Sequence, residues 1–168
     1  MPNPHSDSVN VRSKGYWIAR TAGGCSHCGL KTGLVALVLP PFHEALSLAE
    51  EEQGGPEADS WDPVPCSAFL FHVDYLPDDV QRRLQGFSKT YRPAVSAAAQ
   101  GSYWANHCEH CGSLQEDHGL FCEPEGAFLP VDAASASVIE LAHIDEPFEA
   151  AAGGYACEPQ YLERMIRA

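Results

Sequence analysis

The sequence predicts a single α+β domain, built mainly from an antiparallel sheet with short helices. Two apolar runs have the length and composition of buried strands, one at residues 34–39 and one at residues 66–75. A short amphipathic helix is indicated at residues 77–87. Two Cys-x-x-Cys-Gly segments lie far apart in the chain, so a shared ligand would tie its two halves together.

The chain has 168 residues, which is near the common size of one domain. Residues 1–14 are polar and punctuated by proline, and they predict a disordered tail before a domain at 15–168. The acidic stretch around 50–65 contains glycine and proline and predicts an exposed loop. No apolar run reaches about 18 residues, so we expect no membrane segment and a soluble, cytoplasmic protein.

In the first half, a short strand is expected at 16–19 and a second at 34–39, which Pro40 and Pro41 end. A helical turn is expected over 42–49. The helix at 77–87 has proline and two aspartates in its first turn and a glycine near its end. Its predicted buried stripe is Val80, Leu84 and Phe87.

In the second half, residues 102–107 predict a strand that leads into the second cysteine pair. Residues 119–122 and 127–129 are expected to form a hairpin, and residues 137–142 another strand. The C-terminal residues 159–167 place apolar side chains on one helical face.

The two cysteine segments are Cys25-Ser-His-Cys28-Gly and Cys108-Glu-His-Cys111-Gly. In each, two thiolates can reach one ion while the glycine permits the tight turn beneath it. The pattern predicts one structural zinc per chain, held by four thiolates in a zinc-ribbon-like core. Because a ribbon usually has fewer than about twenty residues between its knuckles, the segment between them is either an insertion or the main domain.

An alternative divides the ligands between two sites that histidines complete. The candidates are His27, His107, His110 and His118, with Cys122 nearby. Because knuckle tips are exposed and tolerate any polar residue, we prefer the single site. The remaining cysteines are expected to be free, because thiols persist in a reducing compartment. They are Cys66, Cys122 and Cys157. Cys66 is expected to pack as a small apolar residue.

The balance of 10 basic and 23 acidic residues gives a net charge of −13. This charge opposes contact with nucleic acid and leaves two interpretations, simple solubility or an acidic surface that docks on a basic protein.

Polar and aromatic side chains gather in sequence around the second knuckle. They could line a groove, or they could support the knuckle through hydrogen bonds, which is the interpretation we favour. The set is Tyr103, Trp104, Asn106, Gln115, Asp117 and Glu123.

A zinc deaminase is one alternative, because His72-Val-Asp74 precedes the second Cys-x-x-Cys. Asp74 is shorter than the glutamate that shuttles the proton in those enzymes, and His107 stands where they have proline. Cys25 and Cys28 would also have no role. A cysteine nucleophile has no local signature.

The segment Tyr103-Trp-Ala-Asn-His-Cys-Glu-His-Cys-Gly-Ser-Leu-Gln115, with the turn at 123–126, resembles a family of uncharacterised bacterial zinc-ribbon-like proteins. Glu116 and Glu125 stand where that family favours glycine. The resemblance implies zinc binding and no particular activity.

These observations predict a noncatalytic, zinc-stabilised module that binds a protein partner, as an inhibitor, immunity factor or adaptor does. The competing prediction is an enzyme with a polar site near Asn106, Gln115 and Asp117. A nucleic-acid-binding ribbon is a third possibility that the charge opposes.

Overall fold

The structure is a computed structural model that describes residues 9–47, 60–96, 101–157 and 159–167. Its secondary structure is 51% strand and 16% helix, so the molecule is mostly sheet. The predicted antiparallel sheet is confirmed, whereas the α+β class and the zinc-ribbon-like core are not. Among these residues, no helix is long and apolar enough to cross a membrane.

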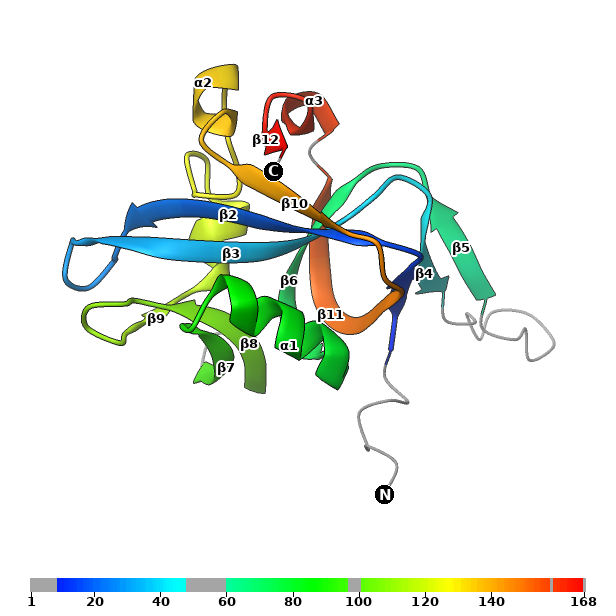
Figure 1. The fold of residues 1–168 in the computed structure, drawn as a ribbon, viewed down its shortest axis with the longest axis horizontal. Coiled ribbons are helices and arrows are strands. Elements are labelled where there is room, and N and C mark those ends of the chain that lie inside the picture. Colours follow the sequence, from blue (N-terminus) through cyan, green and yellow to red (C-terminus); the bar gives the residue numbers. More distant parts are fainter. Residues whose placement is uncertain (1–8, 48–59, 97–100, 158, 168) are drawn as a thin grey trace, which may run out of the picture.

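One curled sheet contains all the strands that the structure describes (Figure 1). Its main path runs β12-β10-β2-β3-β6-β11-β1-β4-β5, while β8 pairs with β6, β7 and β9. All neighbours are antiparallel except β10 and β12. The strands are β1 (Val11–Ser13), β2 (Tyr16–Gly24), β3 (Lys31–Leu39), β4 (His43–Ser47), β5 (Ser60–Val64), β6 (Ala68–Tyr75), β7 (Tyr91–Ser96), β8 (Gly101–His107), β9 (Leu114–Gln115), β10 (Glu140–Ile144), β11 (Phe148–Cys157) and β12 (Ile166–Arg167).

The apolar run predicted as a buried strand is β3, and it is covered on both faces. Successive side chains of a strand point to opposite faces. Val35, Leu37 and Leu39 enter one core cluster, which also contains residues of α1 (Asp78–Phe87). Leu34, Ala36 and Val38 enter the other. A strand between two apolar layers has no reason to alternate with polar residues.

Helix α1 confirms the expected helix and lies on one side of the β2–β3 pair (Figure 1). Asp78 and Asp79 lie in its first turn, where the partial positive charge of the helix favours carboxylates. Val80 and Leu84 are buried in the core, and Phe87 packs against them.

The other side of the sheet is covered by short helices: a π-helix (His118–Cys122), α2 (Ala133–Ala136) and α3 (Pro159–Leu162). The expected hairpin at 119–122 and 127–129 is therefore wrong. Glu125 has a φ of 67°, and the amide N–H of Phe128 donates to the carbonyl of Leu120 at 2.9 Å. The chain turns back as a compact loop, and Phe121 and Phe128 stack with 5.1 Å between their ring centroids.

The expected tail at 1–14 is too long, because Val11–Ser13 forms β1 between β11 and β4. Val11 is buried in the core, so its burial holds this strand. The expected helical turn at 42–49 is instead strand β4, and the expected loop at 50–65 ends in strand β5. The parts of these predictions at residues 1–8 and 48–59 lie outside the described residues.

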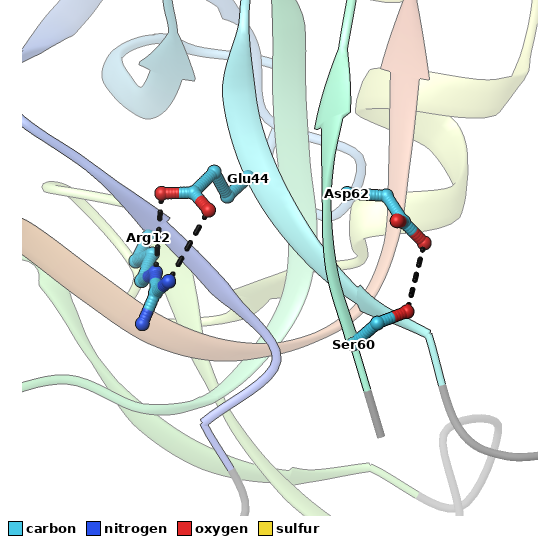
Figure 2. A network of polar contacts seen from close by, with 4 residues as sticks. All are labelled: Arg12, Glu44, Ser60 and Asp62. Carbon is cyan, nitrogen blue, oxygen red and sulfur yellow. Dashed lines mark hydrogen bonds and ion pairs between the residues drawn. The ribbon is translucent and has the colours of Figure 1, made fainter. Parts of the chain in front are cut away.

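Strands β1, β4 and β5 form one end of the sheet, and Figure 2 shows polar contacts between side chains of β1 and β4 and within β5. Arg12 of β1 lies opposite Glu44 of β4 and donates to both carboxylate oxygens, at 3.3 and 3.2 Å. The guanidinium also lies 4.1 Å from the ring centroid of Trp61. On β5, the Ser60 hydroxyl donates to Asp62 at 3.4 Å.

The C-terminal segment also differs from the prediction of one helix at 159–167. Helix α3 ends at Leu162, and β12 then pairs in parallel with β10. Leu162 and Met165 of the predicted apolar face are buried in the core, whereas Ile166 is exposed. The strand expected at 137–142 is β10, which begins at Glu140.

Candidate metal centre

Each cysteine knuckle is the turn of a β-hairpin. The first joins β2 to β3, where Gly24 pairs with Lys31, and the second joins β8 to β9. Gly29 and Gly112 have φ values of 76° and 74°, in the left-handed region that glycine adopts without steric strain. In both turns the glycine N–H donates to the carbonyl of the first cysteine at 3.0 Å.

The structure brings the four predicted cysteines together. Their sulfur atoms all lie within 4.8 Å of one another. Cys25 Sγ lies 3.6 Å from Cys111 Sγ, and Cys28 Sγ lies 3.7 Å from Cys108 Sγ. Zinc–sulfur bonds of about 2.3 Å at tetrahedral angles would place sulfur atoms about 3.8 Å apart. The spacing therefore fits a tetrahedral metal ion.

Hydrogen-bond donors surround the sulfur atoms. The amide N–H groups of His27 and Cys28 point to Cys25 Sγ at 3.3 and 3.4 Å, and that of His110 points to Cys108 Sγ at 3.3 Å. The Ser113 hydroxyl lies 2.9 Å from Cys111 Sγ, and it lowers the pKa of both Cys111 and Cys25, the latter to about 5. Donors of this kind stabilise thiolates, the form that binds metal.

The two knuckles also bind each other directly. The N–H of Glu109 donates to the Thr32 hydroxyl at 3.0 Å, and the Glu109 carboxylate accepts from the N–H of Gly33 at 3.1 Å. On the other side, the N–H of Ser26 donates to Gln115 Oε1 at 3.1 Å. These contacts cross from one hairpin to the other, so they help to hold the two cysteine pairs side by side.

The histidines of the alternative two-site arrangement lie outside the sulfur cluster. His107 is buried, and its Nδ1 lies 3.1 Å from the Thr90 carbonyl; burial lowers its pKa. His110 Nε2 lies 2.9 Å from the Lys31 carbonyl. His118 lies 3.8 Å from Glu123. Within the described ranges, the four cysteines are the one group of three or more His, Cys, Asp or Glu ligands close enough to share an ion.

Two members of the predicted polar set support the knuckles and the sheet beneath them. The Asn106 side chain is fully buried and makes two 2.9 Å hydrogen bonds, one with the N–H and one with the carbonyl of Val35. Gln115 accepts from Ser26 through its carbonyl oxygen, and its Nε2 donates to Cys25 Sγ at 3.3 Å.

Asp117 and Tyr103 are two further buried polar residues of the predicted set. The Asp117 carboxylate accepts from the N–H of His72 at 2.8 Å, and its burial raises its pKa to about 7. The Tyr103 hydroxyl donates to Glu116 at 2.8 Å, and burial raises the pKa of this phenol. Of the other predicted residues, Trp104 packs against Tyr91 and Glu123 is exposed beside His118.

His72 does not join the metal centre, so the deaminase ligand set of one histidine and two cysteines is not assembled in the described residues. His72 instead has a φ of 50° and lines a cavity of about 850 Å³ together with Glu116. The sequence did not indicate that His72 and Glu116 line a cavity, because only the pairing of β6 and the chain path after β9 bring them together.

Cys66 and Cys157 form a disulfide bond, which corrects the expectation that both are free. Cys66 lies just before β6, and Cys157 is the last residue of β11, the strand that pairs antiparallel with β6. Their 91-residue separation hides this proximity in the sequence. Cys122 is free, as expected, and its side chain is exposed.

Searches against protein-family models, curated proteins and solved structures found no match to this chain. The evidence for function is therefore the site itself.

Proposed function

We propose that the four cysteines bind one zinc ion, and that this ion has a structural role. The observation that carries the proposal is the saturated ligand set: four sulfur atoms at tetrahedral spacing would leave no coordination position for water or substrate. Bound zinc would supply folding free energy by joining the β2–β3 and β8–β9 hairpins. The sequence resemblance to zinc-ribbon-like proteins agrees with this choice of metal.

We propose further that the chain is a noncatalytic binding module whose partner is a protein. The support is the net charge of −13, which favours a basic partner, together with the closed metal site. The inhibitor, immunity and adaptor roles all belong to this class. A nucleic-acid partner is disfavoured by the same charge.

The competing enzyme proposal depended on Asn106, Gln115 and Asp117. The side-chain groups of Asn106 and Gln115 are used in hydrogen bonds to Val35, Ser26 and Cys25. Such groups support a fold more readily than they meet a substrate. This arrangement favours the noncatalytic proposal.

The location proposed from the sequence is the cytoplasm, where a reducing environment preserves zinc thiolates. The Cys66–Cys157 disulfide weighs against it, because such bonds are rare in reducing compartments. Cell fractionation with an antibody to the chain tests the location: a cytosolic signal supports it and a periplasmic or secreted signal overturns it.

Affinity capture followed by reconstitution tests the binding proposal. Zinc-loaded protein is used to capture partners from cells of its source, and each candidate is then purified and titrated calorimetrically. We expect a stoichiometric complex whose affinity falls as salt rises, because charge attraction contributes to it. Failure of every purified candidate to bind, or turnover of a small molecule by the zinc-loaded protein, would contradict the proposal.

A further inference from the structure

The cavity beside the first knuckle has a volume of about 850 Å³. Its lining comes from the end of β2 with Ser26, from the π-helix, and from the turn at 123–126 that follows this helix. His72 and Glu116 also line the cavity. Ligand sites usually have volumes of about 300–1,000 Å³, so this cavity is large enough for a side chain with its flanking peptide.

His72 is held in a backbone conformation that non-glycine residues seldom adopt. Its φ of 50° lies in the left-handed region, which costs roughly 1–2 kcal/mol for such residues. The buried Asp117 carboxylate stabilises this conformation by accepting from the His72 N–H at 2.8 Å. On β11, a Cβ atom at Gly153 would lie 3.0 Å from His72 Cβ, so glycine leaves room for the displaced residue. Irregularities of this kind redirect side chains next to binding sites.

Three of the polar side chains that line the cavity are carboxylates, which only accept hydrogen bonds when ionised. The Glu116 carboxylate accepts from the neutral hydroxyls of Tyr103 and Ser96, at 2.8 and 3.1 Å. The ring nitrogens of His72 make no hydrogen bond within the described residues, although the ring lies edge-on to Tyr103. Glu123 and Glu125 stand on the rim, and the lining includes no lysine or arginine.

A preformed metal site does not explain this lining. In the described parts of the chain, the acceptor atoms of His72, Glu116 and the nearby His118 do not gather closely enough to share an ion. The complementary ligand is therefore an organic cation with several N–H donors, which can reach acceptors spread along a cavity.

We propose that this cavity receives a lysine or arginine side chain of the protein partner, which hydrogen-bonds to Glu116 and His72. This inference rests on the proposed binding function and names the contact through which a basic partner is recognised. Asp117 is a positioning residue, because it acts through the backbone of His72. Ser26 of the first knuckle lines the cavity, so a zinc ion held by the cysteines would stabilise this part of the lining without touching the ligand.

A peptide titration followed by ¹⁵N–¹H NMR tests the inference. Zinc-loaded protein is titrated with acetyl-Gly-Arg-Gly-amide, its lysine analogue and its citrulline analogue, which has nearly the shape of arginine without the charge. We expect saturable shifts at Gly119, Gly126 and His72 with the two cationic peptides, and at least about tenfold weaker binding of the citrulline peptide. Equal binding of arginine and citrulline, no binding, or shifts confined to other surfaces would overturn the inference.

Two variants sharpen the test. Glu116→Gln can still accept from Tyr103, and we expect it to weaken binding of the arginine peptide about tenfold. Glu163→Gln removes the same charge from an exposed position in the C-terminal segment and should leave binding unchanged. His72→Asn can keep the left-handed backbone while losing the imidazole, and should also weaken binding. Zinc content and spectral dispersion show whether each variant is folded.

The results also separate this inference from the proposed function. If a purified partner binds while the arginine peptide does not, the cavity is the wrong site and the binding function stands. If the peptide binds and no protein partner is found, the cavity stands as a cation site and the proposed function fails.

Discussion

Asp117 is the residue whose chemistry departs most clearly from its ordinary behaviour. It is a carboxyl group with 3% of its surface exposed, and burial raises its pKa to about 7. The folded protein therefore holds this proton more tightly than the unfolded chain, whose carboxyl has a pKa of about 3.9. By linkage, ionisation of this group destabilises the fold progressively as the pH rises from about 4 to about 7.

Asp117→Asn is expected to remove this pH dependence. The amide oxygen can still accept from the His72 N–H, and nothing ionises. Between about pH 5.5 and about pH 8, wild-type stability should fall by about 2 kcal/mol more than that of the variant. Urea denaturation at both pH values, with zinc in excess, measures the difference. Identical pH dependence in the two proteins would mean that Asp117 does not titrate in this range.

Substitution of glycine by alanine is expected to have opposite effects on stability at Gly126 and at Gly86. A Cβ atom at Gly126 would lie 2.4 Å from the Gly119 carbonyl oxygen and 2.7 Å from that of Leu120. Gly126→Ala should therefore destabilise the protein by roughly 2 kcal/mol or more. In α1, a Cβ at Gly86 would meet nothing within 4 Å, and Gly86→Ala should stabilise the protein by about 0.5–1 kcal/mol. Thermal melts of both variants test these expectations. An unchanged Tm for Gly126→Ala would show that the turn is not tightly packed around Gly126.

At the scale of elements, the disulfide joins β6 to β11 at one end of their pairing. Closing a loop of this length stabilises a protein by up to roughly 4–5 kcal/mol in the chain-entropy model. The double variant Cys66→Ser/Cys157→Ser should unfold at a lower temperature than wild type, and a phosphine reductant should lower the wild-type Tm without affecting the variant.

Thiol counting provides the direct check of that disulfide. In denaturant with a chelator, alkylation should label the five free cysteines before reduction and all seven after it. Seven labelled thiols before reduction would show that the bond is absent. Cys122→Ser is the matched control, because this cysteine is free and exposed.

The strands and the helix also show how the segment between the two knuckles is used in the fold. The segment between the knuckles contributes β3, β6 and α1 to the first core cluster, so it is the main domain and not an insertion in a ribbon. The two knuckles meet because β6 pairs with both β3 and β8. The proposed ion therefore connects two hairpins that the sheet already holds side by side.

For the molecule as a whole, metal content is the decisive property. Purified protein should contain about one zinc per chain by mass spectrometry of the metal. Cys108→Ser should lose the zinc and lower the Tm by roughly 10 °C or more, because zinc binding contributes to folding. Cys122→Ser should change stability by less than about 0.5 kcal/mol. Two zinc ions per chain, or equal losses in both variants, would contradict a single four-cysteine site.

Chelation provides an independent test of the same prediction. A strong chelator should lower the wild-type Tm to near that of Cys108→Ser and should leave the Cys108→Ser protein unchanged. If chelator and variant act additively, the metal is bound elsewhere in the molecule.

The sequence predicts features that depend on neighbouring residues, and it does not predict those that depend on residues distant in the chain. A knuckle is a turn of a few residues, so the spacing of Cys25 and Cys28 indicates a ligand pair directly, and the pattern of Val80 and Leu84 indicates a local helix. The pairing of β1 with β11 and the switch of 43–47 from the expected helical turn to strand depend on distant partners. The residues of these two segments do not indicate which strands they pair with.

The sequence by itself determined the ligand types, the amphipathic helix, the strongly apolar central strand and the acidic charge. Each is a property of neighbouring residues or of composition. Only the tertiary structure decided the order in which the strands pair, that Cys66 meets Cys157, and that His72 and Glu116 share one cavity. The physical reason is that these strand pairings join residues about 30 to 140 positions apart, and the free energy of such contacts depends on the whole fold.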